Sequence, residues 1–83
     1  MQRTILIIED EAAIADNLSY ALQAEGFHAH HVSLGEHAVD VLRSTTLNPA
    51  LIVLDVGLPD INGFEVCRRL RQLSECATAV VAH

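Results

Sequence analysis

Short apolar runs alternate along this chain with segments in which apolar residues recur at helical spacing. Residues 4–8 and 51–54 are nearly unbroken apolar runs, which is typical of strands buried on both faces of a parallel sheet. Residues 27–32 are more polar, so we expect that strand at an edge of the sheet, and residues 77–82 resemble a fourth strand. The pattern therefore predicts four strands with helical segments between them.

Three helices are expected in the intervening segments, at residues 12–25, 34–43 and 63–73. Gly26 follows the first of them as a natural C-terminal cap. The inner face of the second should comprise Ala38, Val39, Val41 and Leu42, and that of the third Phe64, Val66, Cys67 and Leu70. Strands and helices that alternate through short connections predict an α/β fold with a parallel sheet, right-handed crossovers and helices on both faces.

The composition limits which binding partners and cellular locations are expected. The 83 residues make one small domain with a net charge of −6, five arginines and no lysine, so no basic surface for nucleic acid or an anionic membrane is expected. Two cysteines, Cys67 and Cys76, favour a reduced pair over a disulfide framework. No apolar segment approaches the roughly 20 residues of a membrane helix. These features predict a soluble, cytoplasmic protein.

Carboxylates follow both of the most apolar strands. Glu9 and Asp10 come directly after residues 4–8, and Asp55 comes directly after residues 51–54. The carboxyl ends of neighbouring parallel strands share one rim, so these side chains should meet there and raise one another's pKa unless a cation lies among them. Mg²⁺ is commonly bound by such oxygen ligands. Carboxylates that bind Mg²⁺ are the groups needed for phosphoryl transfer onto an aspartate. The alternative is an acidic rim that is merely solvated.

Two motifs resemble a known family. Residues 8–11 (Ile-Glu-Asp-Glu) and 54–65 (Leu-Asp-Val-Gly-Leu-Pro-Asp-Ile-Asn-Gly-Phe-Glu) are similar to the receiver domain of two-component response regulators, most of all the OmpR/PhoB-type transcription regulators. The resemblance covers essentially the whole chain. It implies a flavodoxin-like (CheY-like), doubly wound parallel sheet of strand order 2-1-3-4-5. It also implies that a sensor histidine kinase phosphorylates Asp55, to control transcription through a DNA-binding domain.

The resemblance further implies individual roles. The implied metal site consists of Glu9, Asp10, Asp55 and the main-chain carbonyl of Gly57. Asp10 would bind Mg²⁺ directly and Glu9 mostly through water, while Pro59 and Gly63 would shape the loop that carries the carbonyl.

This sequence also departs from the family pattern. The family's phosphate-pairing lysine has no counterpart, and its switch Ser/Thr would fall at or next to His83. Residues 1–83 would thus be the N-terminal part of a receiver domain, without helix four, strand five, helix five and an effector domain. The strand at residues 77–82 would then be an exposed edge, and we expect an oligomer or a swapped dimer through it.

Two other functions are left open. A receiver-like fragment would bind partners without accepting phosphate, as the missing lysine and hydroxyl suggest. A Mg²⁺-dependent phosphohydrolase would use Asp55 as its nucleophile, but such enzymes usually place a second aspartate at the position of Gly57. The leading interpretation is a signalling module that is not an enzyme.

Weaker patterns have structural explanations. A zinc site is one interpretation of His28, His30, His31 and His37. However, successive residues of a strand point to opposite faces, so His31 points away from His28 and His30, which favours a solvated edge strand. The cluster Arg68, Arg69 and Arg71 is more typical of a solvated helix face than of a phosphate site. Asn62 is expected to cap the helix at residues 63–73.

Overall fold

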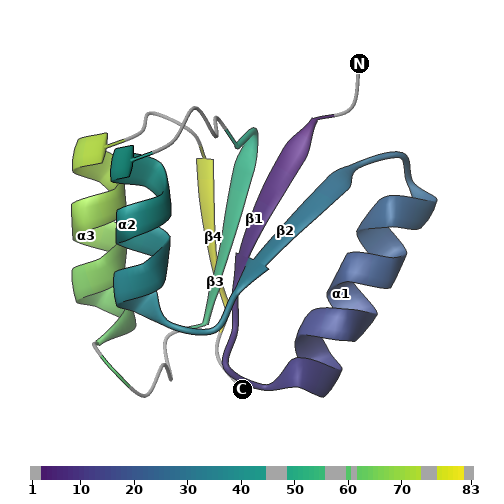
Figure 1. Cartoon of the computed structure of the whole chain (residues 1–83), viewed down its shortest axis with the longest axis horizontal. Helices are drawn as coiled ribbons and strands as arrows, with labels where there is room; N and C mark the ends of the chain where they lie inside the picture. Colours follow the sequence, from purple (N-terminus) through teal and green to yellow (C-terminus); the bar gives the residue numbers. More distant parts are fainter. Residues whose placement is uncertain (1–2, 45–48, 56–59, 61, 74–76, 82–83) are drawn as a thin grey trace.

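Parallel strands form the centre of the molecule (Figure 1). The computed structural model describes residues 3–44, 49–55, 60, 62–73 and 77–81. Within these residues four strands form one sheet: β1 (Thr4–Ile8), β2 (His28–Val32), β3 (Leu51–Asp55) and β4 (Ala77–Val81). Their order is β2-β1-β3-β4, and each neighbouring pair is parallel. This arrangement confirms the flavodoxin-like fold expected from the sequence.

The register of the sheet places β1 between two partners. Ile8, its last residue, pairs with Val32 of β2 and with Leu54 of β3. β3 runs one residue further than predicted, because the backbone of Asp55 stays in the sheet and pairs with Val81 of β4. β2 lies at an edge, as its mixed composition predicted. β4 is the other edge of the described sheet, and association through it stays a prediction.

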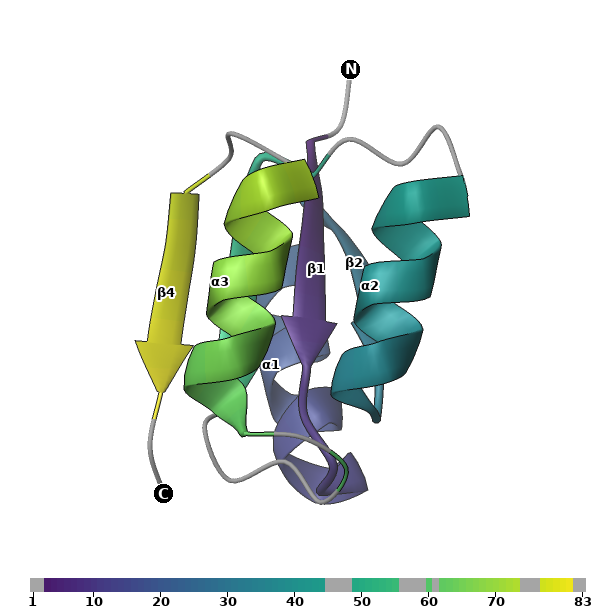
Figure 2. The ribbon, with the colours of Figure 1, turned by 90° about the vertical axis from the view of Figure 1, so that its left-hand side faces the viewer.

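Three helices cover the described sheet: α1 (Ala12–Ala24), α2 (Gly35–Ser44) and α3 (Gly63–Leu73). α1 lies on one face, and α2 and α3 lie side by side on the other (Figures 1 and 2). Gly26 has φ 91°, and its N–H donates to the carbonyl of Gln23, which confirms it as the C-terminal cap of α1. The N–H of Phe27 donates to the carbonyl of Leu22, so Phe27 belongs to this turn and β2 begins one residue later than predicted.

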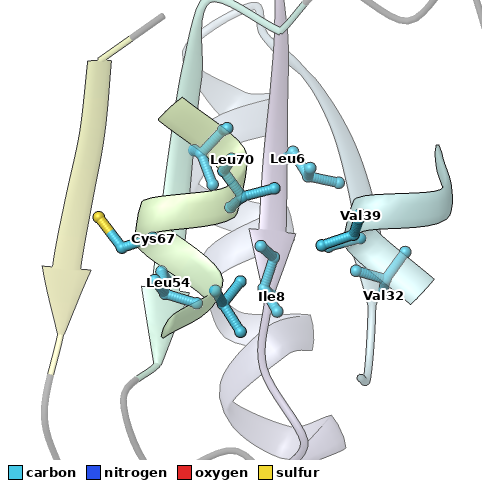
Figure 3. Packing of buried hydrophobic residues seen from close by; sticks show 10 residues of the cluster. Leu6, Ile8, Val32, Val39, Leu54, Cys67 and Leu70 are labelled. Atoms are coloured by element: carbon cyan, nitrogen blue, oxygen red, sulfur yellow. The ribbon is translucent and has the colours of Figure 1, made fainter. Parts of the chain in front are cut away.

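The main core lies between the sheet and the pair α2–α3. Alternate residues of the central strands point into it, as the period of a strand requires. Its buried members are Leu6, Ile8, Val32, Ala38, Val39, Ile52, Leu54, Val66, Cys67 and Leu70 (Figure 3). Val41 and Leu42 are only partly buried against it, at the rim of the predicted inner face of α2.

The opposite face of β3 is less covered than its apolar sequence predicted. Leu51 and Val53 are half-buried, whereas a strand buried on both faces was expected. α1 lies over the β1–β2 side of the sheet, which leaves an apolar recess of about 140 Å³ beside Val53. Ile7, Ile14 and Leu18 line its other walls.

The start of α3 corrects one core prediction. Phe64 was expected to pack inward, but its side chain is 70% exposed. Val66, Cys67 and Leu70 form the buried stripe, and Phe64 lies about a third of a turn away from the middle of it. Asn62 does cap the helix, because its Oδ1 accepts the N–H of Phe64 at 2.8 Å.

The helices are also short and amphipathic. No helix within the described ranges has the length and apolar character that crossing a bilayer would need.

Truncation of one leucine of α3 tests which residues form the core. Leu70 is 1% exposed, so Leu70→Ala should lower the free energy of unfolding by about 2–5 kcal/mol, through lost burial and the cavity left behind. Leu73 lies on the same helix and is 40% exposed, so Leu73→Ala should cost only about 0.5 kcal/mol. Urea denaturation followed by circular dichroism measures both. Equal losses for the two variants would contradict the assignment of the core.

Candidate metal centre

Strand register brings two acidic residues together. Ile8 and Leu54 are partners in adjacent parallel strands, so the residues that follow them, Glu9 and Asp55, come next to one another at the carboxyl rim. Both side chains are buried, with 4% of Glu9 and 3% of Asp55 exposed. They are the buried charged residues of the described chain.

A third carboxylate completes the cluster. Glu9, Asp10 and Asp55 each offer one oxygen, and these three oxygens lie within 4.8 Å of one another. Asp10 is exposed, so the cluster opens to solvent on its side. The structure thus brings together the three carboxylates that the sequence placed at this rim. It differs in one respect, since Glu9 shares the buried position with Asp55 and Asp10 lies outside.

Burial raises the pKa of the Glu9 carboxyl above its ordinary value, because the charged form loses hydration. The main-chain N–H of Glu11 opposes this by donating to Glu9 Oε2 at 3.2 Å, while the hydrogen bond and negative charge of Asp55 raise the pKa further. A cation among these carboxylates would favour the ionised form that burial disfavours.

The main chain of Glu9 is held by the edge strand. Its N–H donates to the carbonyl of Val32 at 3.1 Å. Its carbonyl oxygen lies 2.7 Å from Nε2 of His31. β2 thus fixes the point at which β1 passes into the acidic loop, although it contributes no carboxylate to the cluster.

Asp60, which lies between β3 and α3 in the sequence, binds the start of α2. Its two carboxylate oxygens accept the main-chain N–H groups of Gly35 at 3.0 Å and Glu36 at 2.9 Å. These N–H groups belong to the first turn of α2, where a helix has no carbonyl partners of its own and favours negative charge. No local sequence pattern indicates this cap, because the capping residue lies 25 residues from Gly35.

Three of the expected site residues are not part of the carboxylate cluster that the structure describes. Gly57 and Pro59 lie outside the described residues. Gly63 is the first residue of α3.

The weaker sequence patterns find structural roles. Within the part of the chain that the structure describes, the one group of potential metal ligands is the carboxylate cluster, and no histidine belongs to it. Arg68 and Arg69 form ion pairs with Glu65, and Arg69 also reaches Glu36 of α2 at 2.9 Å. Both arginines are partly exposed, which confirms a solvated face that also ties α3 to α2.

Known proteins agree with this architecture. The family model described as the response regulator receiver domain matches residues 5–82. The transcriptional regulatory protein CreB of Escherichia coli (strain K12) is 49% identical over 74 residues, which cover 88% of this chain and 31% of CreB. The alkaline phosphatase synthesis transcriptional regulatory protein PhoP of Bacillus subtilis (strain 168) is 43% identical over 72 residues, which cover 87% of this chain and 29% of PhoP. The chain therefore spans under a third of the length of these relatives.

Solved structures show the same fold. The response regulator protein TrrA of Thermotoga maritima, in complex with Mg²⁺-BeF, superposes with a TM-score of 0.87 at 30% identity, over 98% of this chain and 70% of TrrA. A CheY-like receiver domain protein of Methanospirillum hungatei JF-1 reaches a TM-score of 0.91 at 23% identity, over 99% of this chain and 65% of that one, and supports the fold alone.

The Asp60 cap predicts a loss of stability on truncation. Asp60→Ala removes both acceptors from the first turn of α2 and should lower the free energy of unfolding by about 1 kcal/mol. Asp60→Asn keeps one acceptor and should recover part of that loss. Urea denaturation of the three proteins measures the difference; an Ala variant as stable as the parent would show that the cap contributes nothing.

The raised pKa of Glu9 predicts a pH dependence of the metal-free protein. From about pH 4.5 upward the unfolded chain loses this proton before the folded chain does, so the folded state binds more protons. The contribution of Glu9 to the free energy of unfolding therefore falls as pH rises through this interval. Glu9→Gln should remove this fall, and Mg²⁺ should oppose it in the parent by binding the folded state.

Urea denaturation in a chelator, repeated across pH, tests this. Glu25→Gln, at an exposed carboxylate beyond α1, serves as the matched control. An unchanged pH profile in Glu9→Gln would contradict the assignment.

Proposed function

Because this chain belongs to the response regulator receiver domain family, we propose that it accepts a phosphoryl group on Asp55 and acts as a signalling module. One observation carries the proposal: Asp55, Glu9 and Asp10 form a single carboxylate cluster at the carboxyl rim of the sheet. Asp55 is the acceptor in this proposal because it ends β3 and is the second residue of the motif at residues 54–65 by which the sequence resembles the family.

The cluster has the chemistry of a Mg²⁺ site. Three carboxylate oxygens within 4.8 Å of one another repel unless a cation lies among them, and hard oxygen donors are the ligands that Mg²⁺ prefers. In this proposal Glu9, Asp10 and Asp55 hold the ion together with the main-chain carbonyl of Gly57. When bound, Mg²⁺ supplies positive charge that neutralises the phosphoryl oxygens.

The proposed reaction is a transfer from a phosphorylated histidine. A carboxylate oxygen of Asp55 forms a bond to phosphorus, the phosphorus–nitrogen bond of the donor breaks, and its electron pair stays on the imidazole nitrogen. The donor approaches from the side of exposed Asp10, because Asp55 itself is only 3% exposed. The low exposure also limits the access of water to the acyl phosphate that is formed.

The donor in this proposal is a sensor histidine kinase, the class of partner that receiver domains use, and the chain itself acts in the cytoplasm. Control of transcription belongs to the same proposal and is supported by CreB and PhoP, which are named as transcriptional regulatory proteins. The route through a DNA-binding domain is what the resemblance to the family implies. Pro59 and Gly63 are proposed to shape the loop between Asp55 and α3. We assign the chain to signalling and not to turnover of a phosphorylated substrate.

Intact mass spectrometry tests the proposal. After incubation with Mg²⁺ and acetyl phosphate, the parent should gain one phosphoryl group that is stable in acid and labile in base. Asp55→Asn removes the nucleophilic oxygen and should reduce the adduct by at least about a hundredfold, the scale typical of losing a covalent catalytic group.

Circular dichroism spectra of both proteins control for folding. A folded parent that gains no phosphoryl group would overturn the proposal and favour binding of partners without phosphorylation. A phosphoryl group that persists in Asp55→Asn would show that another residue is the acceptor.

A further inference from the structure

One imidazole of the edge strand reaches the acidic rim. Nε2 of His31 lies 2.7 Å from the main-chain oxygen of Glu9, and since a carbonyl only accepts, Nε2 must carry the hydrogen and donate it. The pairing of β1 with β2 ends at Ile8 and Val32. The carbonyl of Glu9 thus lies beyond the last paired residues, and the side chain of His31 provides a donor where the strand pairing has ended.

This bond has a consequence for the carboxylates. The N–H of Glu9 is already bonded to the carbonyl of Val32, so β2 holds the main chain of Glu9 through both of its polar groups. Because a peptide bond is planar, fixing the carbonyl of Glu9 also fixes the direction in which the chain enters Asp10. Two of the three carboxylates therefore depend on a donor from a strand that holds no member of the cluster.

We propose that His31 is a positioning residue for the metal centre: its Nε2–H group holds the Glu9–Asp10 peptide so that both carboxylates face Asp55. This inference rests on the proposed function. His31 acts through the main chain and does not touch the cation. Its side chain is exposed, so water competes for the same bond and the effect on metal binding should be moderate.

Two substitutions separate the donor from the ring. His31→Phe keeps a planar ring but has no donor, whereas His31→Gln keeps an N–H group at a similar reach. With Mg²⁺ alone as the probe, isothermal titration calorimetry should show a dissociation constant about three- to tenfold higher for the Phe variant, as expected for a lost supporting hydrogen bond. The Gln variant should bind within about twofold of the parent, because it restores the donor.

His28→Phe is the matched control, since His28 is also exposed and begins the same strand. It should leave the dissociation constant unchanged. Circular dichroism melts of all variants report the fold separately from the metal. Mg²⁺ binding in His31→Phe that equals the parent's would overturn the proposal. So would a Gln variant weakened as much as the Phe variant, because the ring and not its donor would then matter.

A second readout needs no metal. Amide hydrogen exchange at Asp10 and Glu11 should be faster in His31→Phe than in the parent and should recover in His31→Gln. If the parent binds no Mg²⁺, the proposed metal site fails, but the exchange rates still decide the role of His31. Unchanged exchange in the Phe variant would then overturn the positioning role by itself.

Discussion

The pairing of β1 with β3 determines where the clustered acidic residues of this protein lie. Two apolar strands lie side by side in parallel, and Ile8 and Leu54 are partners at their ends. Burying each such side chain contributes about 1.5–3 kcal/mol, so the core beneath α2 and α3 fixes this register firmly. The same register places the residues that follow, Glu9 and Asp55, next to one another, where both side chains are buried.

The molecule therefore places mutually repelling carboxylates at the ends of two strands that hydrophobic burial holds together. Hydrophobic burial keeps the strands together, and the carboxylates at their ends repel and lose hydration. β2 and α2 each hold a part of the chain near the cluster, since His31 of β2 donates to the carbonyl of Glu9 and the first turn of α2 donates to the carboxylate of Asp60. A cluster of mutually repelling carboxylates whose main chain is held by neighbouring elements is suited to bind a cation.

Most of the fold followed from residue patterns, because burial and turn chemistry act locally. The alternation of apolar runs and helical periodicity gave the element order, and the cap roles of Gly26 and Asn62 were visible from their positions. The carboxylate cluster was predictable from the shared rim of neighbouring strands.

Other features depend on contacts distant in sequence, which no local pattern encodes. The exposed side chain of Phe64 reflects the rotation of α3 against the sheet. The contact of His31 with Glu9 spans 22 residues and depends on the pairing of β1 with β2. A side chain of one strand that donates to a carbonyl at the end of the neighbouring strand is not indicated by composition or by residue spacing, so only the structure reveals it.

Glu9, Asp10 and Asp55 are proposed to form one cation site. Paramagnetic broadening of amide NMR signals by substoichiometric Mn²⁺, which takes the same oxygen ligands as Mg²⁺, tests it most directly. Signals at residues 9–11 and 54–55 should vanish first, while those near exposed Asp16 and Asp40 should persist. Broadening spread evenly over all surface carboxylates would contradict the proposed site.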